Sequence, residues 1–168
     1  MTDIDDQDDG DPMRPVVDEI ASACKDAGLT VAVVESLTSG ATSAALGRGE
    51  DASDWFRGSV VAYQMHTKRR LLDVPPGLDP ATPECALHLA SHGLTLLDAD
   101  VCVSITGVGG PDAEGSHPPG EVHVGTATST DSRVSSFRFS GDPQDVVDQS
   151  VLAAVTAVRD AVRDASRH

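Results

Sequence analysis

Aromatic residues are scarce in this sequence of 168 residues, which contains one Trp, one Tyr and three Phe. A core must therefore be built from Val, Leu, Ile and Ala, which favours layers of helix and sheet over an aromatic-rich β-sandwich. Long apolar runs are lacking too, and none approaches the ~20 residues that cross a bilayer. The acidic first residues lack the basic and apolar regions of a secretory signal. These absences predict a cytoplasmic protein with no membrane partner.

Positive charge is the second shortage, with 12 Lys and Arg residues against 27 Asp and Glu residues and a formal net charge of −15. The only lysines are Lys25 and Lys68. A field of this sign repels the phosphates of nucleic acids, so we expect no nucleic-acid partner. At ~1 M salt the screening length falls to roughly 3 Å. The acidic surface would therefore suit a salt-rich cytoplasm.

Cysteine is sparse and is not arranged in redox pairs. The three cysteines lie in apolar stretches without CxxC spacing, at Cys24, Cys85 and Cys102. We expect buried free thiols in a reducing compartment and no disulfide. His88 and His92 stand four residues apart on a predicted helix, but a zinc-protease pattern would require Glu where Leu89 stands. Since polar flanks of an amphipathic helix explain both histidines, we expect no metal.

The length of the chain suits one compact domain, which would bury roughly 70% of the surface of the unfolded chain. Residues 1–12 contain six aspartates and are expected to form a disordered acidic tail, and residues 13–168 to form the domain. Apolar periodicity and turn residues predict the order helix, strand, helix, strand, helix, helix, strand, strand, strand, helix. The ranges are 15–28, 30–36, 38–47, 58–64, 66–74, 82–99, 100–107, 121–129, 133–140 and 142–165.

This order predicts an α/β fold, a single-domain three-layer α/β/α sandwich with a mixed β-sheet. In open α/β sheets, ligands bind outside the carboxyl ends of the strands, where the following loops turn into helices. Three such ends carry polar or glycine-rich segments: "ESLTSG" at 35–40, "YQMHTK" at 63–68 and "TGVGGPD" at 106–112. We expect a functional site there.

The segment "ESLTSG" lies where a buried strand runs into a helix. Unpaired backbone amides at such a junction can hold a phosphate or a developing oxyanion. Ser36, Thr38 and Ser39 supply hydroxyls there, and any of them could be a nucleophile if a base lies within reach. The alternative is that Ser36 or Thr38 caps the helix, which is the commoner role of Ser and Thr at this position.

Lys68 is the candidate base because a desolvated lysine with a lowered pKa can deprotonate serine. Tyr63, the only tyrosine, precedes it by five residues and could relay or donate a proton. The alternative is that Lys68, Arg69 and Arg70 form a solvated cationic face of a helix.

The segment "TGVGGP" would allow a backbone to approach a ligand closely, with Thr106 offering a hydroxyl. The alternative is an ordinary surface loop. Its spacing matches neither the dinucleotide pattern GxGxxG nor the phosphate loop GxxxxGK[ST], so neither cofactor is indicated.

Four separated blocks, "VVESLTSG", "GSVVAYQMHTKRRLLDV", "SITGVGGPD" and "PPGEVHVGTAT", resemble the CinA C-terminal domain family over about residues 15 to 165. The resemblance implies a competence- or damage-inducible type of protein with one α/β/α domain. The family includes enzymes that hydrolyse the amide of nicotinamide mononucleotide to the acid and ammonia. It also implies a small-molecule amide substrate, no cofactor and a homodimer.

By this resemblance Ser36 is the nucleophile and Lys68 the base that takes its proton, with Tyr63 and Thr106 completing the catalytic set. Backbone amides after Ser36 would bind the oxyanion, and water would hydrolyse the acyl-enzyme. The residues expected to contact substrate are those of the first and third blocks: Glu35, Thr38, Ser39, Gly40, Gly107 and Gly110.

The sequence also departs from the family. Leu37 and Ser39 stand where "ESCTGG" is common, and Pro143 and Val147 replace both arginines of the common pattern "GDRxxxR". Arginine suits forked binding of phosphate, and Arg69, Arg70 or Arg138 could compensate, although the sequence does not place them. Two alternatives to the nucleotide amidase therefore stay open: an amidase of a less anionic substrate, and a catalytically quiet module that binds pyridine nucleotides.

Overall fold

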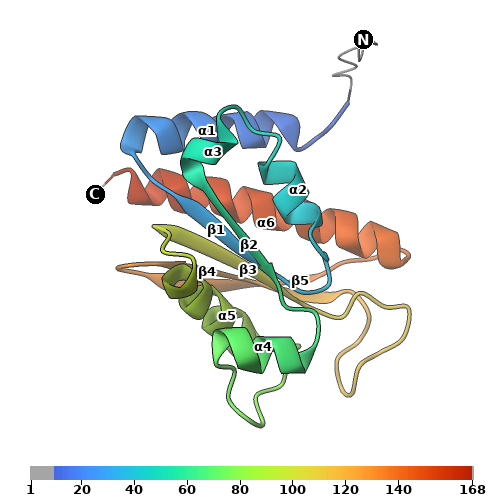
Figure 1. Cartoon of the computed structure of the whole chain (residues 1–168). Coiled ribbons are helices and arrows are strands. Elements are labelled where there is room, and N and C mark those ends of the chain that lie inside the picture. The colour runs from blue at the N-terminus through green and yellow to red at the C-terminus, as the bar shows by residue number, and fades with distance from the viewer. Residues whose placement is uncertain (1–9, 168) are drawn as a thin grey trace, which may run out of the picture.

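A five-stranded β-sheet lies between two layers of helices in the computed structural model, which describes residues 10–167 (Figure 1). This confirms the predicted three-layer α/β/α sandwich with a mixed sheet; the expected tail lies outside the described residues up to position 9. The helices are α1 (Arg14–Ala27), α2 (Ala41–Leu46), α3 (Ala52–Trp55), α4 (Met65–Leu72), α5 (Pro83–Leu96) and α6 (Pro143–Ala165). The strands are β1 (Val31–Glu35), β2 (Phe56–Val61), β3 (Val101–Gly107), β4 (Glu121–Thr128) and β5 (Ser132–Arg138).

The sheet has the order β2-β1-β3-β4-β5. β1 pairs in parallel with both β2 and β3, whereas β4 pairs antiparallel with β3 and β5 antiparallel with β4, as the predicted hairpin requires. The chain leaves β1 for β2 on one side and then returns past β1 to β3 on the other. The carboxyl end of β1 is therefore a topological switch point, the position at which open α/β sheets bind ligands.

The two faces of the sheet are covered by different helices. α1, α2, α3 and α6 lie on one face, and α4 and α5 lie on the other (Figure 1). The first face packs an aliphatic core around Trp55, the largest fully buried side chain, and the second packs Leu72 and Leu89 against Val34. A core built almost wholly from Val, Leu, Ile and Ala agrees with the shortage of aromatic residues.

Local signals explain where the helices begin and end. Thr82 accepts a hydrogen bond from the amide of Cys85 at 3.3 Å, so it caps α5 as predicted. α1 ends at Gly28, whose φ of 67° suits glycine. The helix α3 is absent from the predicted order, because four residues are too few to display a helical period.

All three cysteines are buried and free, as expected. Burial raises the pKa of the thiols of Cys24 and Cys102 to about 12 and that of Cys85 to about 11. The thiolate forms are therefore strongly disfavoured at neutral pH.

Gly93 lets α5 lie close against the sheet. A Cβ at this position would stand 2.5 Å from Cγ2 of Val34 and 2.8 Å from Sγ of Cys102. We expect Gly93→Ala to lower the free energy of unfolding by about 1–3 kcal/mol, although alanine favours helix, because the added methyl overpacks the core. Denaturant unfolding measures the change. Thr95→Ala, an exposed site on the same helix, is the control, and an equal loss there would contradict the packing argument.

Candidate active site

A cavity of about 320 Å³ opens at the carboxyl ends of the three parallel strands. All three predicted segments contribute to its wall, and so do the residues before α5 and the first turns of α6. It is lined by Ser36, Leu37, Tyr63, Met65, Lys68, Pro80, Ala81, Thr106, Gly107, Gly109, Gly110, Glu114, Pro143 and Val147. The strand ends therefore meet around one space, as their positions in the sequence predict.

Ser36 and Lys68, which both line this cavity, are in direct contact. Nζ of Lys68 lies 2.9 Å from Oγ of Ser36, and it also contacts the backbone carbonyl oxygens of Ala62 at 2.6 Å and Tyr63 at 3.2 Å. The lysine is only 2% exposed, while Arg69 and Arg70 beside it are exposed. Lys68 is therefore not part of a solvated cationic face.

Burial lowers the pKa of Lys68 below its ordinary value of 10.5, against the opposing effects of Cys85 and Glu114. Desolvation disfavours the ammonium form because a charge loses the stabilising response of water. The neutral amine, which is the form that can accept a proton, is thus more accessible here than on a surface lysine.

Glu35 fixes the loop that carries Ser36. Its buried carboxylate accepts hydrogen bonds from the hydroxyl of Thr38 at 2.7 Å and from the amides of Thr42 at 2.9 Å and Ser43 at 3.1 Å, and from the Ser43 hydroxyl. Burial pushes the pKa of Glu35 upward, but these hydrogen bonds outweigh it and the pKa is lowered. Glu35 therefore remains a carboxylate and satisfies the first amides of α2.

That geometry corrects one expectation from the sequence. Thr38 does not cap α2. The N-cap residue is Gly40, which has no side chain to bind the first amides of the helix, and the carboxylate of Glu35 binds them instead. The side chains of Glu35 and Thr38 are buried against each other and lie outside the cavity wall, so their contact with a substrate stays a prediction. Ser39 and Gly40 also lie outside the wall; of the expected contact residues, Gly107 and Gly110 line it.

Tyr63 and Thr106 both line the cavity, in different ways. Tyr63 is 64% exposed. Within residues 10–167, its hydroxyl makes no hydrogen bond to Ser36 or Lys68. The Thr106 hydroxyl is buried and donates to the carbonyl of Pro80 at 2.6 Å. Thr106 thereby ties the end of β3 to the segment before α5. Their catalytic roles stay predictions.

His117 holds the glycine-rich loop at 108–120 in place through two side-chain contacts. This loop supplies Gly109, Gly110 and Glu114 to the cavity. Nδ1 of His117 lies 2.8 Å from Oε1 of Glu121, and Nε2 lies 3.1 Å from Oδ2 of Asp79. These two carboxylates raise the pKa of the imidazole, which is therefore more readily protonated.

The contacts of His117 with Glu121 and Asp79 should make the stability of this loop depend on pH. The pKa of His117 is raised in the folded state, so the stabilisation is complete below the ordinary value of 6.5 and is lost as the pH rises through the folded value. We expect amides of 108–120 to exchange hydrogen faster across that window, after correction for the intrinsic effect of pH. His117→Asn should remove the pH dependence, and an unchanged profile in that variant would contradict this assignment.

Comparison with known proteins identifies the family of this chain. The model of the CinA C-terminal domain matches residues 13–162. The chain belongs to this family.

Its relatives agree with that assignment. A protein of Bacillus subtilis (strain 168), provisionally named competence-damage inducible, is 38% identical over 130 residues, which are 75% of this chain and 31% of that protein. The chain thus spans about a third of the length of the curated relatives it matches. Solved CinA superfamily proteins from Klebsiella pneumoniae 700603 and Enterobacter cloacae each superpose with a TM-score of 0.86 at 26% identity, covering 92% and 96% of this chain and 99% of theirs.

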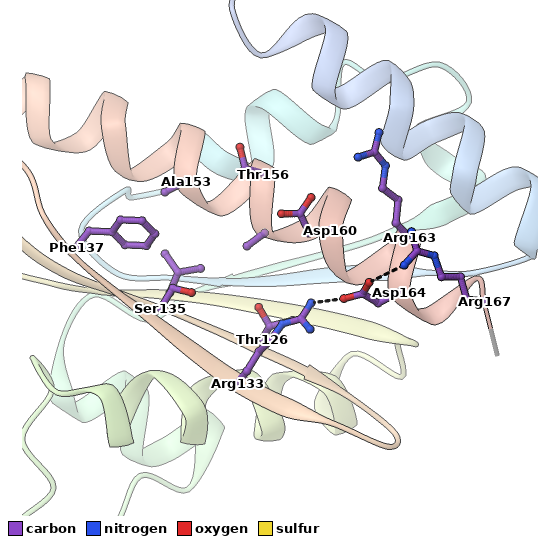
Figure 2. A pocket seen from close by; sticks show the side chains of 12 residues that line it. Thr126, Arg133, Ser135, Phe137, Ala153, Thr156, Asp160, Arg163, Asp164 and Arg167 are labelled. Carbon is purple, nitrogen blue, oxygen red and sulfur yellow. Dashed lines mark hydrogen bonds and ion pairs between the residues drawn. The ribbon is translucent and has the colours of Figure 1, made fainter.

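A second hollow of the CinA domain, about 500 Å³ in volume, lies between α6 and the strands β4 and β5 (Figure 2). Its arginines are already paired with carboxylates. Arg133 contacts Asp164 at 2.8 Å, Arg167 lies 3.8 Å from the same residue, and Arg163 contacts Glu19 at 2.6 Å. Since none of the predicted site residues lies there, the smaller cavity is the candidate active site.

His88 and His92 of the CinA domain each contact a backbone carbonyl oxygen. Their rings stack with centroids 3.8 Å apart. Nε2 of His88 lies next to the carbonyl oxygen of Leu72, and Nδ1 of His92 lies next to the carbonyl oxygen of His88. Over residues 10–167, no three His, Cys, Asp or Glu side chains are grouped to hold a metal ion. Within the same residues, no helix has the length and hydropathy of a membrane span.

Proposed function

We propose that this CinA domain hydrolyses a small-molecule carboxamide to the acid and ammonia, with Ser36 as nucleophile and Lys68 as base. The contact of 2.9 Å between Nζ and Oγ carries the proposal. A nucleophile and a base within hydrogen-bond reach are the signature of an activated serine. The burial of Lys68 supports it further, because a solvated lysine would stay protonated.

Lys68 acts as a base in its neutral form. Its two N–H bonds can serve the carbonyls of Ala62 and Tyr63, and its lone pair then remains for the hydroxyl of Ser36. Oγ of Ser36 attacks the carboxamide carbon while its proton passes to Nζ. The carbon–nitrogen bond then breaks, and the same proton goes to the leaving nitrogen, which departs as ammonia.

Water completes the cycle by attacking the ester carbon on Ser36. Lys68 takes one proton of this water and returns it to Oγ as the acid leaves. The amides of Leu37 and Thr38 follow the nucleophile directly and, among the described residues, donate to no protein acceptor. We assign them as donors to the oxyanion that forms in both steps.

Ammonia release tests this proposal, with nicotinamide mononucleotide, the substrate implied by the family resemblance, and its dephosphorylated nucleoside as the first compounds. Ser36→Ala should release none, and acid-quenched wild-type protein should carry an acyl group on Ser36 by mass spectrometry. Ser91→Ala, an exposed serine on α5, is the matched control and should keep full activity. Activity retained in Ser36→Ala would contradict the proposal, as would a compound that raises the melting temperature but is never consumed.

A further inference from the structure

The cavity around Ser36 contains very little positive charge. Among the residues described, Lys68 is the only Lys, Arg or His in its wall, and its amine is already in contact with two carbonyls and Ser36. Within residues 10–167, Glu114 is the only carboxylate of that wall. Among the described residues, a ligand in the cavity therefore meets one exposed carboxylate and no cation other than Lys68.

The Glu114 carboxylate is available to a ligand. Within residues 10–167, no Lys, Arg or His lies within ion-pair distance of it, and its side chain is exposed. Its backbone is nevertheless held in place, because Glu114 and His117 exchange two hydrogen bonds of 3.0 Å across the loop. His117 is fastened in turn to Asp79 and Glu121. A carboxylate on a fixed backbone can select a ligand by charge.

The start of α6 is closed to an anion. Pro143 and Val147 line the cavity, and the proline has no N–H to offer. The carboxylates of Asp142 and Asp145 bind each other's amides there at 2.9 Å. A phosphate at this helix start would face two carboxylates instead of free N–H groups.

The first turn of α4 also reaches the cavity, where Met65 lines the wall. His66 in this turn is exposed and is not among the residues that line the cavity, and Arg69 and Arg70 lie in the last turn and are also exposed. Apart from Ser36, Tyr63 and Thr106, the rest of the described wall is apolar or glycine, with Leu37 and Ala81 among its residues. At about 320 Å³ the cavity is near the lower end of the roughly 300–1,000 Å³ of small-molecule sites.

We infer that the substrate of this site is a compact carboxamide that carries a positive charge and no phosphate, and that Glu114 is the residue that selects the charge. The inference rests on the proposed function, since it names the substrate class of the Ser36 site. The formal net charge of −15 acts in the same direction, because an acidic surface raises the local concentration of cations and repels phosphates.

Binding to the Ser36→Ala protein tests this selection without turnover. The probes are nicotinamide riboside, a pyridinium cation without phosphate, nicotinamide mononucleotide, which adds the phosphate, and uncharged nicotinamide, each titrated by calorimetry at ~0.1 M salt. We expect the riboside to bind about tenfold more tightly than the nucleotide. Adding Glu114→Gln should weaken the riboside about fivefold and leave nicotinamide unchanged. Adding Asp112→Asn, which removes one charge from the same loop outside the wall, should change neither.

Each contrary result overturns the inference. A nucleotide that binds as tightly as the riboside would show that phosphate is accepted, and a failure of both to bind would exclude the cationic class. An equal loss in the Asp112→Asn protein would show that the general field, and not Glu114, selects the charge. Ammonia release by the wild-type protein separates the two claims: selective binding without release contradicts only the proposed function, and fast hydrolysis of the nucleotide contradicts only the selection.

Discussion

Lys68→Met is expected to lower kcat/KM by roughly a thousandfold, because a positioned general base contributes about 10²- to 10⁴-fold. Methionine keeps the length and the apolar stem of the side chain but cannot take the proton of Ser36. The measurement is ammonia release with the best of the tested carboxamides. Far-UV circular dichroism confirms that the variant is folded.

Lys68→Arg separates a base from a mere positive charge. The guanidinium keeps donors and charge but stays protonated, so it cannot serve as a base, and we expect this variant to be as inactive as Lys68→Met. If the arginine variant keeps more than a tenth of the wild-type activity, Lys68 acts through its charge and the assigned mechanism is wrong.

The lowered pKa of Lys68 also predicts two dependences on pH. The rate should rise with pH as the amine loses its proton, with a midpoint below the ordinary value of 10.5. Between the folded value and 10.5 the unfolded chain binds more protons, so the stability of the folded protein should rise with pH over the same window. Lys68→Met should lose this rise in stability, which denaturant titrations at several pH values would reveal.

Glu35→Ala is expected to lower the free energy of unfolding by about 3 kcal/mol. The buried amides of Thr42 and Ser43 would lose their common acceptor, and each buried group left unpaired costs about 1–3 kcal/mol. Activity should fall as well, because the loop that carries Ser36 would lose its attachment to α2. Denaturant unfolding and ammonia release measure the two effects.

Two further variants define the role of Glu35. Glu84→Ala removes an exposed carboxylate from the first turn of α5 and should cost only a few tenths of a kcal/mol. Glu35→Gln keeps one acceptor but turns an NH₂ group toward a backbone amide, so an intermediate loss is expected. A Glu35→Ala protein within 0.5 kcal/mol of the wild type, an order-of-magnitude limit for neutral surface changes, would contradict the assignment.

Acid should affect the wild type and Glu35→Gln differently. The folded pKa of Glu35 lies below its ordinary value of 4.5, so its stabilisation is present above 4.5 and is lost as the pH falls through the folded value. The wild-type protein should therefore lose stability more steeply than Glu35→Gln over this range.

Much of the fold follows from local patterns. The continuous apolar runs of β1 and β3 indicate strands covered on both faces, and Thr82 followed by Pro83 marks the start of α5. The order of the strands does not follow, because a parallel strand can pair on either side of its predecessor and only long-range packing decides. The four residues of α3 contain no full period of the helix.

The candidate site divides in the same way. The positions of Ser36, Lys68 and Thr106 at strand ends were enough to predict that they meet. The roles of Glu35 and His117 were missed, since the partners of Glu35 lie up to eight residues ahead across a turn and Asp79 lies 38 residues from His117. Such hydrogen bonds depend on the folded path of the backbone and leave no spacing pattern in the sequence.

The three buried thiols have a practical consequence for experiments on this protein. Maleimide and iodoacetamide react with accessible thiolates, and Cys24, Cys85 and Cys102 are buried with their pKa values raised to about 12, about 11 and about 12. A single cysteine introduced on the exposed part of the 108–120 loop should therefore take up a fluorophore selectively in the native protein. The movement of that loop can then be followed by fluorescence without first removing the natural cysteines.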